Sequence, residues 1–286
     1  MLWRVKNEPA SPERGTASEV AMTTFQTFAS GSSGNAALLS SGGTHLLLDM
    51  GISCRRVCQA LNKLGLRPEE LAGVLITHEH SDHISGLATY IKKYRTPIFC
   101  TPGTARQLAY RIAGIEDLLR PVPLGERMAL DGVEVELLPT SHDCRESAAF
   151  RIDTVSGSLG FLTDTGYIPE GTGRRLLGAE LLVLESNHDI EMLRAGPYPY
   201  ALKQRVLGEW GHLSNADAAR YAAASVRAGT RAILLAHLSR ENNTPQLALE
   251  AAGALLRQEG YTGPLDVAPP DAMSGRYTLE GAVCGR

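Results

Sequence analysis

The stretch His78-Glu79-His80-Ser81-Asp82-His83 decides the fold. It places three histidines and an aspartate close together, directly after an apolar segment, residues 73–77, that is expected to form a strand. Imidazole and carboxylate groups at a strand-to-helix turn suit zinc and similar ions such as manganese. Solvated loops rarely concentrate so many potential ligands, so we interpret this stretch as a metal-binding motif.

One short segment cannot complete two metal sites, so further ligands are expected later in the chain. Three candidates come directly after apolar segments, where the rim of a sheet would place them: His142, Asp164 and His237. Each of them alone could be a hydrogen-bonded structural residue. Their arrival in this order, each at the end of a predicted strand, favours a shared metal centre.

The remaining sequence alternates short apolar segments with amphipathic ones. Strands are expected at residues 25–29, 36–40, 45–49, 98–100, 127–130, 133–139, 148–152, 159–163, 181–185 and 232–236. Helices are expected at residues 53–64, from the histidine motif through Tyr94, and at 103–112, 200–209, 215–228 and 245–258. Groups of strands with helices outside them predict a layered α/β sandwich.

Length and composition are those of an ordinary globular protein. The 286 residues include 43% hydrophobic and 21% charged residues. The net charge of −3 gives no global basic field, which counts mildly against a nucleic-acid substrate, although bound metals would add local positive charge. The five irregularly spaced cysteines indicate reduced cytosolic thiols rather than a structural zinc site.

The N-terminal segment differs from the rest of the chain. Residues 1–21 are polar and charged, without the apolar core of a secretion signal and without helix or strand periodicity. We expect a disordered tail or an extension upstream of the true start. Residues 22–286 are expected to form a single domain. No apolar run is long enough to span a bilayer, so we expect no membrane partner.

The order of Asp49, the histidine motif, His142, Asp164 and His237 resembles the five-motif signature of the metallo-β-lactamase superfamily. The resemblance implies an αββα four-layer sandwich with the metal site at one edge of the two sheets. It implies two divalent ions, Zn²⁺ or Mn²⁺, with iron also compatible. The first ion would be held by His78, His80 and His142 and the second by Asp82, His83 and His237, with Asp164 bridging both and Asp49 orienting ligand histidines.

A complete second site favours a phosphodiester substrate. Two ions can clamp a phosphoryl group while a hydroxide that bridges them attacks phosphorus. Asp82 would complete the second site, and Asp164 would help to position the hydroxide.

Four further stretches look like the YycJ (WalJ)-type subfamily of metallo-β-lactamase-fold nucleases: Ser30-Gly-Ser-Ser-Gly-Asn35, Glu185-Ser-Asn-His-Asp189, Gly211-His-Leu-Ser-Asn215 and His237-Leu-Ser239. This resemblance implies a cytoplasmic 5′-to-3′ exonuclease on double-stranded DNA, with a role in DNA repair. It places His212 and His188 near the scissile phosphate, where either would donate a proton or a hydrogen bond. Capping of the following helix is the alternative for His212.

Several polar residues are candidates for substrate contact: Ser32, Ser33, Asn35, Asn187, Ser214, Lys203 and Arg205. Ordinary turns and solvated helix faces are the alternatives for them. Tyr198 and Tyr200 could stack on a terminal base.

The short interval between Asp164 and His237 leaves no room for the extra domain of β-CASP nucleases, and there is no Gly/Pro-rich arm like that of ribonuclease Z. A ribonuclease, a small-molecule phosphodiesterase, a thioester or lactone hydrolase of the same fold, and a metal-binding regulatory protein remain as alternatives.

Overall fold

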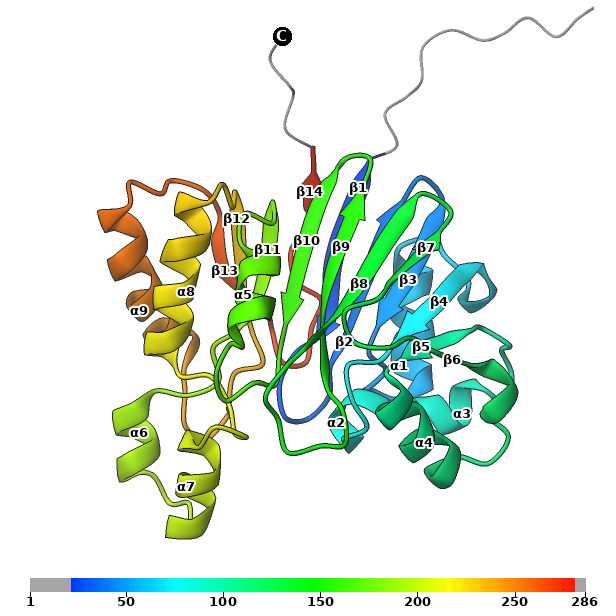
Figure 1. Cartoon of the computed structure of the whole chain (residues 1–286), viewed down its shortest axis with the longest axis horizontal. Coiled ribbons are helices and arrows are strands. Elements are labelled where there is room, and N and C mark those ends of the chain that lie inside the picture. Colours follow the sequence, from blue (N-terminus) through cyan, green and yellow to red (C-terminus); the bar gives the residue numbers. More distant parts are fainter. Residues whose placement is uncertain (1–21, 281–286) are drawn as a thin grey trace, which may run out of the picture.

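Residues 22–280, which the computed structural model describes, form two seven-stranded sheets that pack face to face (Figure 1). The first sheet has the order β14-β1-β2-β3-β4-β5-β6 and the second β13-β12-β11-β10-β9-β8-β7. In the first sheet the strands are β1 (Thr23–Ala29), β2 (Ala36–Ser41), β3 (Thr44–Leu48), β4 (Leu71–Leu75), β5 (Ile98–Cys100), β6 (Leu119–Pro121) and β14 (Tyr277–Leu279). In the second they are β7 (Arg127–Leu130), β8 (Val133–Pro139), β9 (Ala148–Thr154), β10 (Gly157–Leu162), β11 (Leu181–Glu185), β12 (Ala232–Ala236) and β13 (Leu265–Val267).

Helices cover the outer face of each sheet (Figure 1). The first sheet is flanked by α1 (Cys54–Lys63), α2 (Ser81–Ile84), α3 (Leu87–Tyr90) and α4 (Pro102–Arg111). The second is covered by α5 (Glu170–Leu176), α8 (Asn215–Arg227) and α9 (Pro245–Gln258). Two short helices, α6 (Ile190–Ala195) and α7 (Tyr200–Leu207), lie together beyond one end of β11 and β12. Residues 68–70 and 116–118 form single 3₁₀ turns.

Side-chain alternation along the strands produces three apolar layers. In β3, Leu46 and Leu48 face the layer between the sheets, whereas Leu47 faces the helices of the first sheet. In β11, Val183 joins the layer between the sheets and Leu184 packs beneath the helices of the second. Both faces of these strands are buried, which explains why they are continuous apolar runs rather than alternating ones. The four layers confirm the predicted αββα sandwich.

The direction of the strands brings the predicted ligands to one edge. Strands β3 to β6 run parallel, and so do β10 to β13. Carboxyl ends of parallel strands meet at one edge of a sheet, where ligands commonly bind. Asp49 follows β3 directly, the histidine motif follows β4, and Asp164 and His237 follow β10 and β12.

One expected helix is broken. The sequence predicts a continuous helix from the histidine motif through Tyr94, but α2 and α3 are separate single turns on either side of Gly86. A Cβ atom at Gly86 would lie 2.3 Å from the carbonyl oxygen of Ile52, so the chain must pass close to its neighbour here. The amide of Gly86 donates to the carbonyl of Met50 at 2.9 Å instead of continuing a helix.

Other elements were not predicted: β6, β13, β14, α5 and α6 are short, so their sequences carry little periodicity. Residues 1–21, for which a tail or upstream extension is predicted, lie outside the described residues, as do residues 281–286. Within residues 22–280, no helix combines the length and the apolar character needed to cross a bilayer.

Candidate metal centre

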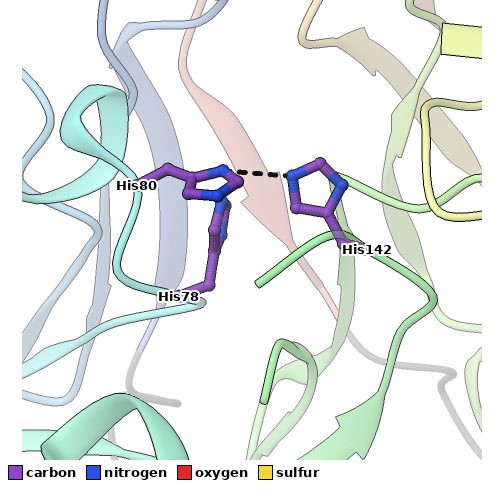
Figure 2. A group of neighbouring side chains, drawn as sticks. All are labelled: His78, His80 and His142. Atoms are coloured by element: carbon purple, nitrogen blue, oxygen red, sulfur yellow. Dashed lines mark hydrogen bonds between the residues drawn. The ribbon is translucent and has the colours of Figure 1, made fainter. Parts of the chain in front are cut away.

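Three imidazoles from two loops point toward one another (Figure 2). His78 and His80 come from the loop after β4, and His142 from the loop after β8. One ligand atom from each lies within 4.8 Å of the others, and His142 Nε2 lies 3.2 Å from His80 Nδ1. Burial lowers the pKa of both His78 and His142, which favours the neutral ring, the form that binds a metal.

A second group of ligand atoms lies beside the first. Asp82 Oδ2 is 3.5 Å from His83 Nε2 and 3.5 Å from His237 Nε2. His83 and His237 are buried, whereas Asp82 is partly exposed. Asp82 and His83 follow β4 of the first sheet, and His237 follows β12 of the second, so this group joins the two halves of the sandwich.

Asp164 lies between the two groups. Its Oδ2 is 3.2 Å from His83 Nε2, and its Oδ1 is 3.5 Å from His237 Nε2 and 3.8 Å from His142 Nε2. Burial alone would raise the pKa of this carboxyl, but the charges of His237 and His83 hold it well below its usual range. An ionised carboxylate therefore reaches both histidine groups.

The unpaired atoms of the cluster test whether a cation fits it. His78 Nε2, His237 Nε2 and Asp164 Oδ2 are buried, yet none has a hydrogen-bond partner among the described residues. A buried polar atom without a partner costs about 1–3 kcal/mol. Shared cations would satisfy these atoms together, and nitrogen and carboxylate donors suit zinc, manganese or iron. The residues present fit divalent metal ions.

Two buried carboxylates orient the histidine rings. Asp49 Oδ2 accepts from His83 Nδ1 at 2.8 Å, and Asp49 Oδ1 accepts from the Thr77 amide at 2.8 Å. The bond turns His83 Nε2 toward Asp82 and Asp164. Asp49 therefore contacts the ring of a candidate ligand histidine, as the resemblance implies for a residue that orients such rings.

The second orienting carboxylate, Glu185, was missed as a site residue. It accepts from His212 Nδ1 at 2.7 Å and from His237 Nδ1 at 3.0 Å, and its other oxygen accepts from the Thr165 amide at 2.9 Å. Burial would raise the pKa of this carboxyl, but His212 and His237 outweigh it and hold the pKa at about 2. The available signal was an ionisable group that ends an otherwise apolar, fully buried strand.

A cavity of about 160 Å³ opens beside the cluster. His142 and His212 line this cavity and also belong to the cluster. Of the predicted substrate residues, Ser32, Asn187 and Arg205 line it as well. Arg205 Nη2 lies 2.5 Å from Asp143 Oδ2, so its charge is already paired.

The other predicted substrate residues have structural partners. Ser33 Oγ accepts from Arg240 at 2.8 Å, and Lys203 Nζ donates to the Arg194 carbonyl at 2.6 Å, which ties α7 to α6. Ser214 Oγ caps α8 by accepting from the Asp217 amide. Asn35 alone in this group reaches the cluster, with Nδ2 3.2 Å from His83 Nε2.

His212 and His188, both predicted near the scissile phosphate, are placed differently. His212 lies among the ligand groups and lines the cavity. His188 is 1% exposed and does not line the cavity, and neither ring nitrogen has a hydrogen-bond partner among the described residues. Burial lowers the pKa of His188 to about 4, so its ring is neutral. The geometry brings only His212 to the site.

Comparison with known proteins agrees with this arrangement. The sequence profile described as "Beta-lactamase superfamily domain" matches residues 44–238. The exodeoxyribonuclease YycJ of Bacillus anthracis is 35% identical over 238 residues, 83% of this chain and 90% of that protein. The exodeoxyribonuclease WalJ of Streptococcus pneumoniae is 34% identical over 227 residues, 78% of this chain and 84% of that protein.

Among solved structures, the metallo-β-lactamase-fold protein YhfI from Bacillus subtilis gives a TM-score of 0.67 at 17% identity, covering 90% of this chain and 99% of that one, which supports the fold. The chain therefore belongs to the β-lactamase superfamily of metal-dependent hydrolases and, within it, to the family of the YycJ and WalJ exodeoxyribonucleases.

Proposed function

We propose that the protein is an exodeoxyribonuclease that hydrolyses phosphodiester bonds of double-stranded DNA from 5′ ends, with two divalent metal ions, zinc or manganese. The observation that carries the proposal is the convergence of two ligand groups on Asp164 beside an open cavity. The similarity to YycJ and WalJ supports DNA as the substrate.

The chain offers ligands for both ions. His78, His80 and His142 would hold the first, Asp82, His83 and His237 the second, and Asp164 both. When bound, such ions supply a water-derived nucleophile at neutral pH and neutralise charge on the phosphoryl oxygens. Asp49 and Glu185 hold the histidine rings in position through hydrogen bonds to their Nδ1 atoms.

His212 is our candidate for proton transfer. Glu185 accepts from its Nδ1, so its other nitrogen, Nε2, remains for the substrate. The ionised Glu185 carboxylate fixes the orientation of this ring at the edge of the cavity. We assign to His212 Nε2 the donation of a proton to the leaving 3′ oxygen, and no proton-donor role to the enclosed His188.

A substrate panel tests the reaction class. Purified protein with manganese is expected to shorten linear duplex DNA from 5′ ends, and to act less on RNA, cyclic nucleotides and thioesters. End-labelled duplexes, with the label on the 5′ or the 3′ strand end, report polarity. Hydrolysis of thioesters alone would overturn the nuclease proposal, and preferred hydrolysis of RNA would move it to a ribonuclease. We also infer a role in DNA repair from the resemblance to this nuclease subfamily, and a raised mutation rate in cells that lack the gene would support it.

The variant Asp82→Ala tests the second metal site. The substitution removes the carboxylate that lies beside both His83 and His237. We therefore expect the loss of activity and a fall in bound metal from two ions toward one, while the fold is retained. Metal analysis, circular dichroism and nuclease assay measure the three effects. The matched control is Asp117→Ala, an exposed aspartate remote from the cluster, which should behave like the wild type. Full activity in Asp82→Ala would contradict a working second site.

A further inference from the structure

The cavity beside the histidine cluster is bordered by a largely exposed indole. Trp210 lines this cavity and is 60% exposed. Gly211 and His212, which follow it in the chain, line the same cavity. Tryptophan carries a large apolar surface that proteins usually cover, so an indole left open beside the proposed proton donor is available to a flat ligand.

The remaining walls combine apolar and polar groups. Tyr198, Leu202 and Val206, in and before α7, supply apolar surface. Asn187 and Asn242 also line the cavity, and both are largely enclosed, at 4% and 1% exposed. An apolar wall beside an exposed indole suits a flat aromatic ring with polar edges, which is the chemistry of a nucleobase.

The size and the position of the cavity suit a single base beside the candidate metal centre. The volume of about 160 Å³ is close to that of an apolar cavity that holds one benzene ring, about 150 Å³. The cavity therefore has room for one base. His142 and His212 belong to the cavity and to the candidate metal centre, so a base in the cavity would lie next to a phosphate held at that centre.

We propose that this cavity holds the terminal nucleobase of the DNA strand being shortened, stacked on Trp210, so that the last nucleotide leaves the duplex before its bond is cleaved. This inference rests on the proposed function, because it takes the substrate to be a DNA end. Every base has a π-face, so stacking on Trp210 does not depend on the DNA sequence. This tolerance suits an exonuclease, which must accept each base in turn. Ends that are already unpaired are then better substrates than fully paired ends, since they need no unpairing.

Binding can be measured without hydrolysis. The chain has two tryptophans, Trp3 and Trp210, so Trp3→Phe leaves Trp210 as the sole reporter of indole fluorescence. The probe is a short 5′-phosphorylated oligothymidylate with a phosphorothioate at the first linkage to slow hydrolysis. We expect it to quench the Trp210 emission, and the same oligonucleotide with an abasic 5′-terminal nucleotide to bind more weakly by about 5- to 150-fold, without quenching.

Kinetics with variants test the same contact. Trp210→Ala should raise KM for duplex DNA by a similar factor of about 5 to 150, and Trp210→Phe should restore most of the loss because it keeps a π-face. The alanine variant should no longer distinguish a thymidine terminus from an abasic one. Tyr110→Ala is the control, because Tyr110 is an aromatic on α4 that is 89% exposed and does not line the cavity.

The outcomes separate this inference from the nuclease proposal. If DNA is cleaved but Trp210→Ala cleaves normal and abasic ends as the wild type does, and no base-dependent quenching occurs, the base subsite is overturned while the nuclease stands. If no DNA is cleaved but quenching depends on the terminal base, the subsite stands while the nuclease proposal fails. Equal cleavage of paired and unpaired ends by the wild type would also overturn the requirement for unpairing.

Discussion

Backbone strain is concentrated in the candidate metal centre. Four non-glycine residues of the described chain have a positive φ, and three of them are Asp49 at 57°, Asp164 at 55° and His237 at 56°. Such conformations cost about 1–3 kcal/mol each and persist only where the surroundings hold them. Each of the three comes at a strand end, at the edge of the sandwich where the candidate ligands gather.

Glu185→Gln should weaken the metal centre while preserving its ligands. The amide keeps the size of the carboxylate, but it lacks the negative charge on the oxygen that accepts hydrogen bonds from His212 and His237. Loss of a group that orients a ligand typically lowers metal affinity about 10- to 100-fold. Competition with a chromophoric chelator measures the affinity, and Glu170→Gln, on the exposed surface of α5, serves as the control. Unchanged affinity would show that the histidines hold their positions without this carboxylate.

His188 should make the protein sensitive to acid. Burial lowers the pKa of the folded ring from 6.5 to about 4, so the unfolded state takes up a proton first as the pH falls. The contribution of neutral His188 to the free energy of unfolding is therefore fully present above about pH 6.5 and is lost between about pH 6.5 and 4. At pH 5 this loss is about 2 kcal/mol. Urea denaturation at pH 7.5 and 5 should show a smaller pH effect in His188→Phe than in the wild type. An equal pH effect in both proteins would rule out this role.

At the scale of elements, local pattern predicted the long and fully buried segments better than the short ones. The strands β11 and β12 were predicted with their observed bounds, because their apolar runs end at clear breaks. The helix predicted through Tyr94 failed at Gly86, where the controlling contact is the Ile52 carbonyl from a different part of the chain. No local pattern carries that information.

The C-terminal strand β14 was also missed, because its three residues gain their partner only by pairing with β1, whose register joins Thr23 to Leu279. Leu279 is buried in the layer between the sheets. Leu279→Ala should therefore lower the free energy of unfolding by about 2–4 kcal/mol, through lost burial and the space left behind. Val155→Ala, at an exposed apolar position, should change it little. Chemical denaturation compares the two variants, and similar values would mean that β14 contributes little to the sandwich.

For the whole molecule, the sequence contained the candidate ligands but not their surroundings. The histidine motif, His142, Asp164 and His237 could be found because each follows an apolar run. Their grouping around Asp164, the ion pair between Arg205 and Asp143, and the cavity beside Trp210 depend on segments far apart in the chain. Arg205 was predicted to contact a phosphate or to lie on a solvated helix face. In the structure its side chain pairs with Asp143, from the loop that carries His142, and it lines the cavity.

The position of the ligands across both sheets predicts that metal stabilises the whole sandwich. His78, His80, Asp82 and His83 follow a strand of the first sheet, whereas His142, Asp164 and His237 follow strands of the second. At a free concentration 100 times its Kd, one bound ion adds about 2.7 kcal/mol to the free energy of unfolding. For a domain of this size, that corresponds to roughly 5–10 °C in Tm.

We therefore expect a chelator to lower Tm by at least this amount and re-addition of zinc or manganese to restore it. Asp82→Ala should lose part of the shift, because one ligand group remains, and Asp117→Ala should keep all of it. Differential scanning calorimetry with and without chelator measures each difference. A Tm that is independent of metal would mean that the two sheets are held by their shared apolar layer alone, and that the unpaired atoms of His78, His237 and Asp164 are tolerated without an ion.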